Sequence, residues 1–230
     1  MTAAMLYLHE TIDILGSGQD GYMRSVHERA AHSAEAGISR LVGCWRVVGS
    51  TGRWPQVVNL WEMDGWSHWA EALERQFVPA RKDASLAPWW TRTAEFRSGG
   101  FDRILVPASD CPTQAELLAS RRKAWVFEQT ITRVDTDASL FVDEAIGALR
   151  PLVGRRGIEL VGAYVAPMTP GEVVWIWSAP TFSVLCAWYE ERDREVGWRR
   201  WLDGRGRRFG AGTSHWLVPA EDSPWHPGHD

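Results

Sequence analysis

The sequence contains a long segment that occurs twice. Residues 37–74 and residues 157–191 carry the same features in the same order: Gly-Ile, Leu-Val-Gly, a Val-Val pair, a tryptophan and then an amphipathic run. Each copy is followed by the tetrapeptide Leu-Val-Pro-Ala, at Leu105–Ala108 and again at Leu217–Ala220. A duplication of this length predicts a chain built from two related halves, each with the same order of secondary structure.

The apolar pattern of each half predicts the order β-α-β-β-α-β. In the first half, period-two alternation and β-branched runs predict strands at 5–12, 40–48, 56–62 and 101–106, with helices at 19–36 and from Ser67 onward. The second half repeats this order, with strands at 125–133, 158–166, 172–178 and 213–218. We therefore expect an α+β fold with two ferredoxin-like repeats.

The duplication also predicts how the two repeats pack. A ferredoxin-like sheet carries both helices on one face and leaves the other face apolar, so two sheets that cover each other close a pseudo-dimeric α+β barrel. We expect the first repeat at 1–108, a linker at 109–123, the second repeat at 124–220 and a disordered tail at 221–230.

Composition excludes several classes of function. A net charge of -4 and a pI near 6.0 argue against a nucleic-acid partner, and no apolar run is long enough for a membrane span. The first 13 residues lack basic side chains, which favours a cytoplasmic protein without a signal peptide. The cysteines, Cys44, Cys111 and Cys186, form no C-x-x-C pair, and no phosphate-binding glycine loop is present. We therefore expect neither a metal nor a nucleotide cofactor.

Both halves resemble the NIPSNAP family within the dimeric α+β barrel group. The resemblance rests on the glycine at Gly16 after the first strand, on Gly43-Cys44-Trp45, on VVNLWE at Val57–Glu62 and on Trp66–Trp69. It covers residues 5–108 well, while residues 124–220 keep little beyond Leu-Val-Gly-Ala-Tyr and Val-Val-Trp-Ile-Trp. The resemblance implies the barrel fold and a range of activities: haem-degrading oxygenases, cofactor-free oxygenases of aromatic polyketides, dehydratases and lyases. Haem is disfavoured, because the helix after Trp69 offers no axial histidine.

The resemblance also implies a pocket between each sheet and its own helices. For the first half, we expect one sheet face to carry Tyr7, His9 and Thr11 beside Val57, Asn59 and Trp61, with Trp45 nearby. In the second half we match Glu128 to His9, Trp175 to Asn59, Trp177 to Trp61 and Tyr164 to Trp45, and His215 of the last strand is a further candidate. The chain's 15 tryptophans either fill a wide core or line such cavities.

Glu128 and His9 are the candidate catalytic residues. A carboxyl group among tryptophan and tyrosine rings has a raised pKa and is suited to acid/base work near neutral pH, although a solvated strand-edge glutamate explains Glu128 equally simply. A buried histidine either transfers a proton or is only hydrogen-bonded. Asn59, Trp61, Trp45, Tyr164, Trp175, Trp177 and His215 are the candidate substrate-binding residues.

These features predict an enzyme that acts on a small apolar or aromatic molecule, of terpenoid or polyketide type, without metal or nucleotide. Lyase or isomerase chemistry is the first expectation. The alternatives are a cofactor-free monooxygenase of the same fold and a non-catalytic ligand-binding or structural barrel protein. The chain is expected to be a monomer with pseudo-two-fold symmetry or a homo-oligomer.

Overall fold

The computed structural model describes residues 5–108, 111–205 and 212–228. The first half comprises β1 (Leu6–Ile14), α1 (Gln19–Glu35), β2 (Arg40–Val47), β3 (Gln56–Met63), α2 (Trp66–Phe77), η1 (Pro79–Arg81), α3 (Leu86–Ala94) and β4 (Arg97–Pro107). The short helix α4 (Gln114–Ala119) connects it to the second half, which comprises β5 (Val126–Arg133), α5 (Ala138–Gly154), β6 (Glu159–Val165), β7 (Glu172–Ala179), α6 (Phe182–Glu191), η2 (Arg192–Arg194), α7 (Val196–Arg205) and β8 (Thr213–Pro219).

The described strands form one closed antiparallel barrel, in the order β1-β3-β2-β8-β5-β7-β6-β4. The two sheets meet at two seams, where β2 pairs with β8 and β4 pairs with β6. The repeated Leu-Val-Pro-Ala lies at these seams, with Pro219 opposite Trp45 and Pro107 opposite Tyr164. The predicted fold class is confirmed, and the tetrapeptide recurs because each copy ends a strand that crosses to the other half.

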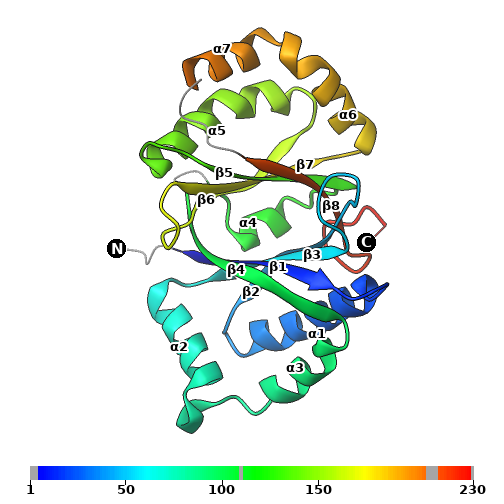
Figure 1. Ribbon diagram of the computed structural model, residues 1–230, viewed down its shortest axis with the longest axis vertical. Coiled ribbons are helices and arrows are strands. Elements are labelled where there is room, and N and C mark those ends of the chain that lie inside the picture. The colour runs from blue at the N-terminus through cyan, green and yellow to red at the C-terminus, as the bar shows by residue number, and fades with distance from the viewer. Residues whose placement is uncertain (1–4, 109–110, 206–211, 229–230) are drawn as a thin grey trace.

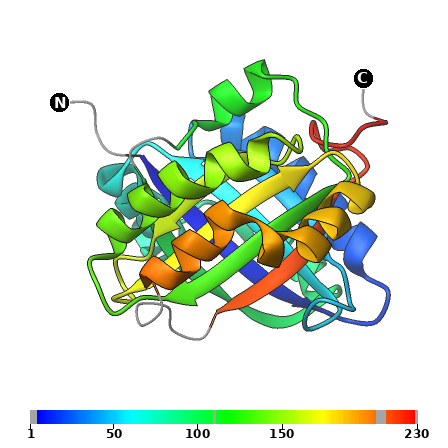
Figure 2. The same cartoon turned by 90° about the horizontal axis from the view of Figure 1, so that it is seen from above.

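Helices cover the outside of the barrel on two opposite sides. Figure 1 shows α1, α2 and α3 on the side of the first half and α5, α6 and α7 on the side of the second. Seen from above in Figure 2, α5 and α7 lie side by side across the strands of the second half. In the described part of the chain, no helix is long and apolar enough to cross a membrane.

Large side chains fill the interior of the barrel. Trp45 and Tyr164 lie there fully buried, with Trp45 against Phe127 at 5.3 Å and Tyr164 against Tyr7 at 4.8 Å between ring centroids. A Cβ on Gly43 would lie 2.0 Å from the ring of Trp45, and a Cβ on Gly162 would lie 2.0 Å from the hydroxyl of Tyr164. The two Gly-x-aromatic sequences are therefore a packing requirement, and Trp45 and Tyr164 belong to the barrel core instead of a pocket wall.

The segment after β8 corrects one expectation. The sequence predicts a disordered tail at 221–230, of which residues 229–230 lie outside the described part of the chain. Within residues 221–228, Trp225 is 2% exposed and its Nε1 donates a hydrogen bond to the carbonyl oxygen of Val42 at 2.7 Å. Its ring packs edge-on against Phe127 at 5.4 Å. The apolar surface of one tryptophan thus holds a proline- and glycine-rich segment against the barrel.

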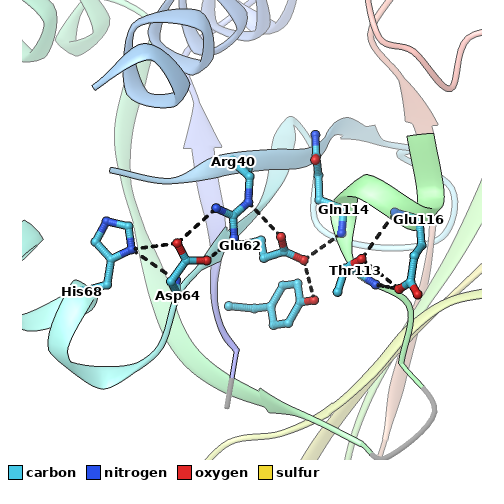
Figure 3. A network of polar contacts seen from close by, with 8 residues as sticks. Arg40, Glu62, Asp64, His68, Thr113, Gln114 and Glu116 are labelled. Carbon is cyan, nitrogen blue, oxygen red and sulfur yellow. Dashed lines mark hydrogen bonds and ion pairs between the residues drawn. The ribbon is translucent and has the colours of Figure 1, made fainter. Parts of the chain in front are cut away.

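A polar network joins the start of α4 to strands β1, β2 and β3 (Figure 3). The buried carboxylate of Glu62 accepts hydrogen bonds from the Tyr7 hydroxyl at 2.8 Å, from the backbone N–H of Gln114 at 2.7 Å and from Arg40 Nε at 2.9 Å. Arg40 also binds Asp64 at 2.5 Å, and this hydrogen bond holds the pKa of Asp64 below its ordinary value. Glu62 is therefore a satisfied structural charge that ties the linker to the first half.

Candidate functional site

The pairing register decides which side chains of β1 face the helices. Glu10 lies opposite Asn59 and Leu8 lies opposite Trp61, whereas His9 lies opposite Leu60. Because side chains alternate between the two faces of a strand, Glu10 shares the helix-facing side with Asn59 and Trp61, and His9 points into the barrel. The expected grouping of Tyr7, His9 and Thr11 with Asn59 and Trp61 is therefore wrong by one residue of register.

His9 is enclosed in the middle of the barrel. It is fully buried, and its Nε2 shares a hydrogen bond of 2.7 Å with the amide oxygen of Gln129. Burial lowers the pKa of His9 to about 4, so the ring is neutral at physiological pH. His9 lies opposite Leu60 and Gln129 lies opposite Ile176, and Leu60 and Ile176 are the matching residues of VVNLW and VVWIW. His9 and Gln129 therefore occupy equivalent positions in the two repeats. The match of Glu128 to His9 is thereby corrected to Gln129.

A cavity of about 430 Å³ lies between the second sheet and its helices. Its walls come from β5, β7 and β8 below and from α5, α6, η2 and α7 above, and they are mostly apolar. They comprise Glu128, Thr130, Leu149, Val153, Ile158, Trp175, Trp177, Trp188, Arg192, Trp198, Trp201, Leu202 and Ser214. The structure thus brings three sequence-derived candidates together, Glu128, Trp175 and Trp177, at a volume suited to a small organic molecule.

Glu128 is the only carboxyl group among the described residues that line this cavity. It is 9% exposed, and its Oε1 accepts a hydrogen bond from the hydroxyl of Tyr189. Burial raises the pKa of Glu128, and Tyr189, Arg192 and Ser214 offset part of that rise. Burial also raises the pKa of Tyr189 to about 12, so the phenol keeps its proton and continues to donate. Glu128 therefore changes between its protonated and its ionised form at a higher pH than a solvated glutamate does.

Arg192 and the tryptophans of α7 were missed by sequence reasoning. The guanidinium carbon of Arg192 lies 3.9 Å from the ring centroid of Tyr189 and 5.4 Å from that of Trp198. The buried Nε1 of Trp198 has no hydrogen-bond partner among the described residues. The described lining of the cavity therefore combines one acid, Glu128, and one cation, Arg192. The spacing of Trp198 and Trp201, which places them on one helical face, was the available signal.

The remaining second-half candidate, His215, does not line this cavity. Its Nδ1 is 3.2 Å from the carbonyl oxygen of Thr51, and a Cβ on Gly52 would lie 2.0 Å from its ring. It therefore packs against the loop between β2 and β3, where a structural role accounts for it.

A second cavity, of about 400 Å³, lies between the first sheet and α1, α2 and α3. Trp61, Trp69, Trp89 and Trp90 line it, and Glu10 lies at the sheet side. The Oε2 atom of Glu10 accepts hydrogen bonds from Trp61 Nε1 at 2.7 Å and from Asn59 Nδ2 at 3.1 Å. Glu10 is thus the functional candidate that the register error concealed. No group of three or more potential metal ligands occurs among the described residues.

Comparisons with known proteins support the fold. A monooxygenase candidate from Lactobacillus acidophilus NCFM aligns with a TM-score of 0.63 and 11% identity, covering 94% of this chain and 93% of that one. An anthrone oxidase-like protein aligns at 0.57 with 11% identity, covering 94% and 91%. A mutant chlorite dismutase from Candidatus Nitrospira defluvii aligns at 0.52 with 11% identity, covering 96% and 94%. At these identities, the likeness establishes the dimeric α+β barrel fold and not an activity.

The family is not shown by these comparisons. No family model matches the chain, and no curated protein matches it. A NIPSNAP domain protein from Burkholderia xenovorans aligns at 24% identity, but its TM-score of 0.38 over 47% of this chain, against 99% of that one, supports no conclusion. The NIPSNAP resemblance therefore stays a prediction.

Proposed function

We propose that the second-half cavity binds a small apolar or aromatic molecule and that Glu128 moves a proton on it. The observation that carries this proposal is a single buried carboxyl group, held by Tyr189, in a mostly apolar cavity whose walls include five tryptophans. Such walls bind flat apolar bodies, and the raised pKa of Glu128 suits it to general acid/base catalysis.

Each polar group of the cavity has a role in this proposal. In its carboxylate form, Glu128 accepts a proton from a weakly acidic C–H or O–H of the substrate, and Tyr189 keeps the carboxyl group in place. The negative charge that then develops on the substrate is stabilised by Arg192, a cation in the same wall. Return of the proton to another atom gives isomerisation, and loss of a neighbouring group gives a lyase reaction.

A cofactor-free monooxygenase is the second candidate, and the names of two fold neighbours favour it. It uses the same first step, because deprotonation makes an aromatic substrate electron-rich enough to react directly with dioxygen. For an acidic CH₂ group, one oxygen atom of dioxygen enters as a carbonyl and the other leaves as water with the two hydrogens. In this case too, Glu128 removes the first proton.

Anthrone, an apolar aromatic ketone with an acidic CH₂ group, is a suitable probe for both candidates. Calorimetry measures its binding, NMR in D₂O measures exchange of its CH₂ hydrogens, and an oxygen electrode measures dioxygen consumption. The variant Glu128→Gln keeps the shape of the side chain, and Glu190→Gln on the exposed side of α6 is the matched control.

We expect wild type and Glu190→Gln to bind anthrone and to accelerate exchange, and Glu128→Gln to bind it but to lose about a hundredfold or more of the rate. Dioxygen consumption that is lost with the same variant selects the monooxygenase. Saturable binding with no exchange in any variant would select the non-catalytic binding protein instead.

A further inference from the structure

The first-half cavity carries a pair of neighbouring carboxyl groups that the proposed function does not use. Glu10 on β1 lies directly opposite Asp102 on β4, so both side chains leave the same face of the sheet, and both line the cavity. Glu10 is half-buried, while Asp102 is exposed at the cavity's edge. The pair therefore extends from the floor of the cavity toward solvent.

Neither carboxyl group is matched by a hydrogen-bonded cation. The donors to Glu10 are the neutral groups of Trp61 and Asn59, and Asp102 has no hydrogen bond or ion pair with another described residue. Arg103, its neighbour in the same cavity, is held by Glu172 at 2.5 Å. Burial raises the pKa of Glu10, and the charge of Asp102 raises it further. The charge of Arg97 lowers the pKa of both carboxyl groups, but it forms no hydrogen bond with either. One cation therefore faces two carboxyl groups, and the remaining negative charge is left for a ligand to compensate.

The other arginines of the cavity wall also have acidic neighbours. Arg75 Nη2 lies 2.8 Å from Glu71 in α2, and Arg29 Nη2 lies 4.0 Å from Asp83. Arg75 and Arg29 are thus paired with acidic side chains other than Glu10 and Asp102. With the single charge of Arg97 set against Glu10 and Asp102, the charge that remains unmatched in the cavity is negative.

The aromatic walls suit a cation. The rings of Trp61, Trp69, Trp89 and Trp90 line the cavity, and indole faces attract ammonium and guanidinium groups. One of these rings already does so, because the guanidinium carbon of Arg97 lies 4.0 Å from the ring centroid of Trp90. Aromatic faces and unmatched carboxyl groups at one site are the combination that recognises organic cations.

The duplication provides an internal comparison. In the second half, the positions equivalent to Glu10 and Asp102 are Thr130 and Ser214, which lie opposite each other on β5 and β8. Their hydroxyl oxygens are 2.9 Å apart, so this pair is uncharged and satisfied. The two halves thus carry different chemistry at the same place in the sheet, which indicates two cavities with different ligands.

We propose that the first-half cavity binds an organic cation, a protonated amine or quaternary ammonium on an apolar body, with the cationic group at Glu10 and Asp102 and the apolar part against the tryptophans. This site is separate from the acid/base site at Glu128. A neutral aromatic molecule would fill the same walls but would leave the two carboxyl groups with only the charge of Arg97 beside them.

Calorimetry with benzyltrimethylammonium tests the proposal, and N,N-dimethylbenzamide is a neutral probe of similar size. The variants are Glu10→Gln and Asp102→Asn, which remove one charge each; Asp102 is exposed, so its variant should fold as wild type does. Glu35→Gln, a change at an exposed residue at the end of α1 that does not line the cavity, is the matched control.

We expect the cation to bind at least about tenfold more tightly than the neutral probe, and to lose about tenfold in affinity in each variant but not in Glu35→Gln. The neutral probe should be insensitive to all of these changes. Equal binding of the two probes, or a cation affinity unchanged in both variants, overturns the proposal. Glu128→Gln should leave the cation's affinity unchanged, so this site and the acid/base site succeed or fail separately.

Discussion

Replacement of Trp225 by alanine tests whether the segment after β8 is part of the barrel's core. The side chain is 2% exposed, packs on Phe127 and donates a 2.7 Å hydrogen bond to the carbonyl oxygen of Val42. The substitution removes the ring and the donor and leaves the rest of the chain unchanged.

The size of the effect follows from these contacts. A buried tryptophan removes roughly 150–250 Å² from water, which at about 25 cal/mol per Å² is about 4–6 kcal/mol as an upper estimate. Trp→Ala changes in cores cost about 3–5 kcal/mol, and the unmade hydrogen bond contributes about 1 kcal/mol of that. We expect a loss of about 4 kcal/mol in the free energy of unfolding for Trp225→Ala. Trp225→Phe, which keeps a ring but loses the donor, should lose about 1–2 kcal/mol.

Urea unfolding followed by circular dichroism measures both variants. Trp54→Ala is the control, because Trp54 is 61% exposed and its loss should cost less than about 1 kcal/mol. If Trp225→Ala costs no more than Trp54→Ala, then the segment does not pack in solution as described and the reasoning is refuted.

Three further predictions concern stability. Because the folded-state pKa of Glu128 is raised, wild type should lose stability as pH rises from the ordinary carboxyl range through that raised pKa, and urea unfolding of Glu128→Gln should lack this loss. The pKa of His9 is about 4 in the folded state and near 6.5 in the unfolded state, so the free energy of unfolding of wild type should fall by roughly 3 kcal/mol between pH 6.5 and pH 4. His9→Gln should not show this loss. Parallel plots of unfolding free energy against pH for the two proteins would contradict the prediction. Gly43→Ala should lower the urea midpoint by the equivalent of about 1–3 kcal/mol, because its methyl group meets the Trp45 ring; an unchanged midpoint would show that the ring moves freely.

The fold could be predicted from the sequence because the duplication constrains it. Two β-α-β-β-α-β units, each with an uncovered sheet face, have few ways to pack, and the closed barrel is the one observed. The repeated Leu-Val-Pro-Ala lies in β4 and β8, the two strands that pair across the seams. The tetrapeptide does not give the pairing itself, because β4 and β8 each pair with a strand of their own half, β1 and β5, and also with a strand of the other half, β6 and β2.

The first-half site was misplaced because β1 is covered on both faces. Leu8, Glu10 and Ile12 face the helices and Tyr7, His9 and Thr11 face the barrel interior, so the alternation of residue types does not say which side is which. A shift of one residue exchanged His9 for Glu10. Glu128 was grouped with Trp175 and Trp177 through its match to His9. The structure places Glu128 in the same cavity as these tryptophans because that match was displaced by one residue, which offset the register error in β1.

The spacing of residues in the sequence does not predict the helical wall of the second-half cavity. Arg192 and Trp198 approach Glu128 only through the way η2 and α7 fold back over the sheet, more than sixty residues later in the chain. Trp225 was missed for a different reason: proline and glycine around it are typical of a mobile segment, and a single buried ring outweighed that composition.

The pH dependence of anthrone C–H exchange tests the central claim most directly. The account predicts that the wild-type rate rises with pH along a single ionisation that lies above the ordinary glutamate range, and that Glu128→Gln shows only the uncatalysed rate at every pH while still binding the probe. An identical profile in wild type and Glu128→Gln would contradict it, because the carboxyl group in the tryptophan-lined cavity would then take no part in moving the proton.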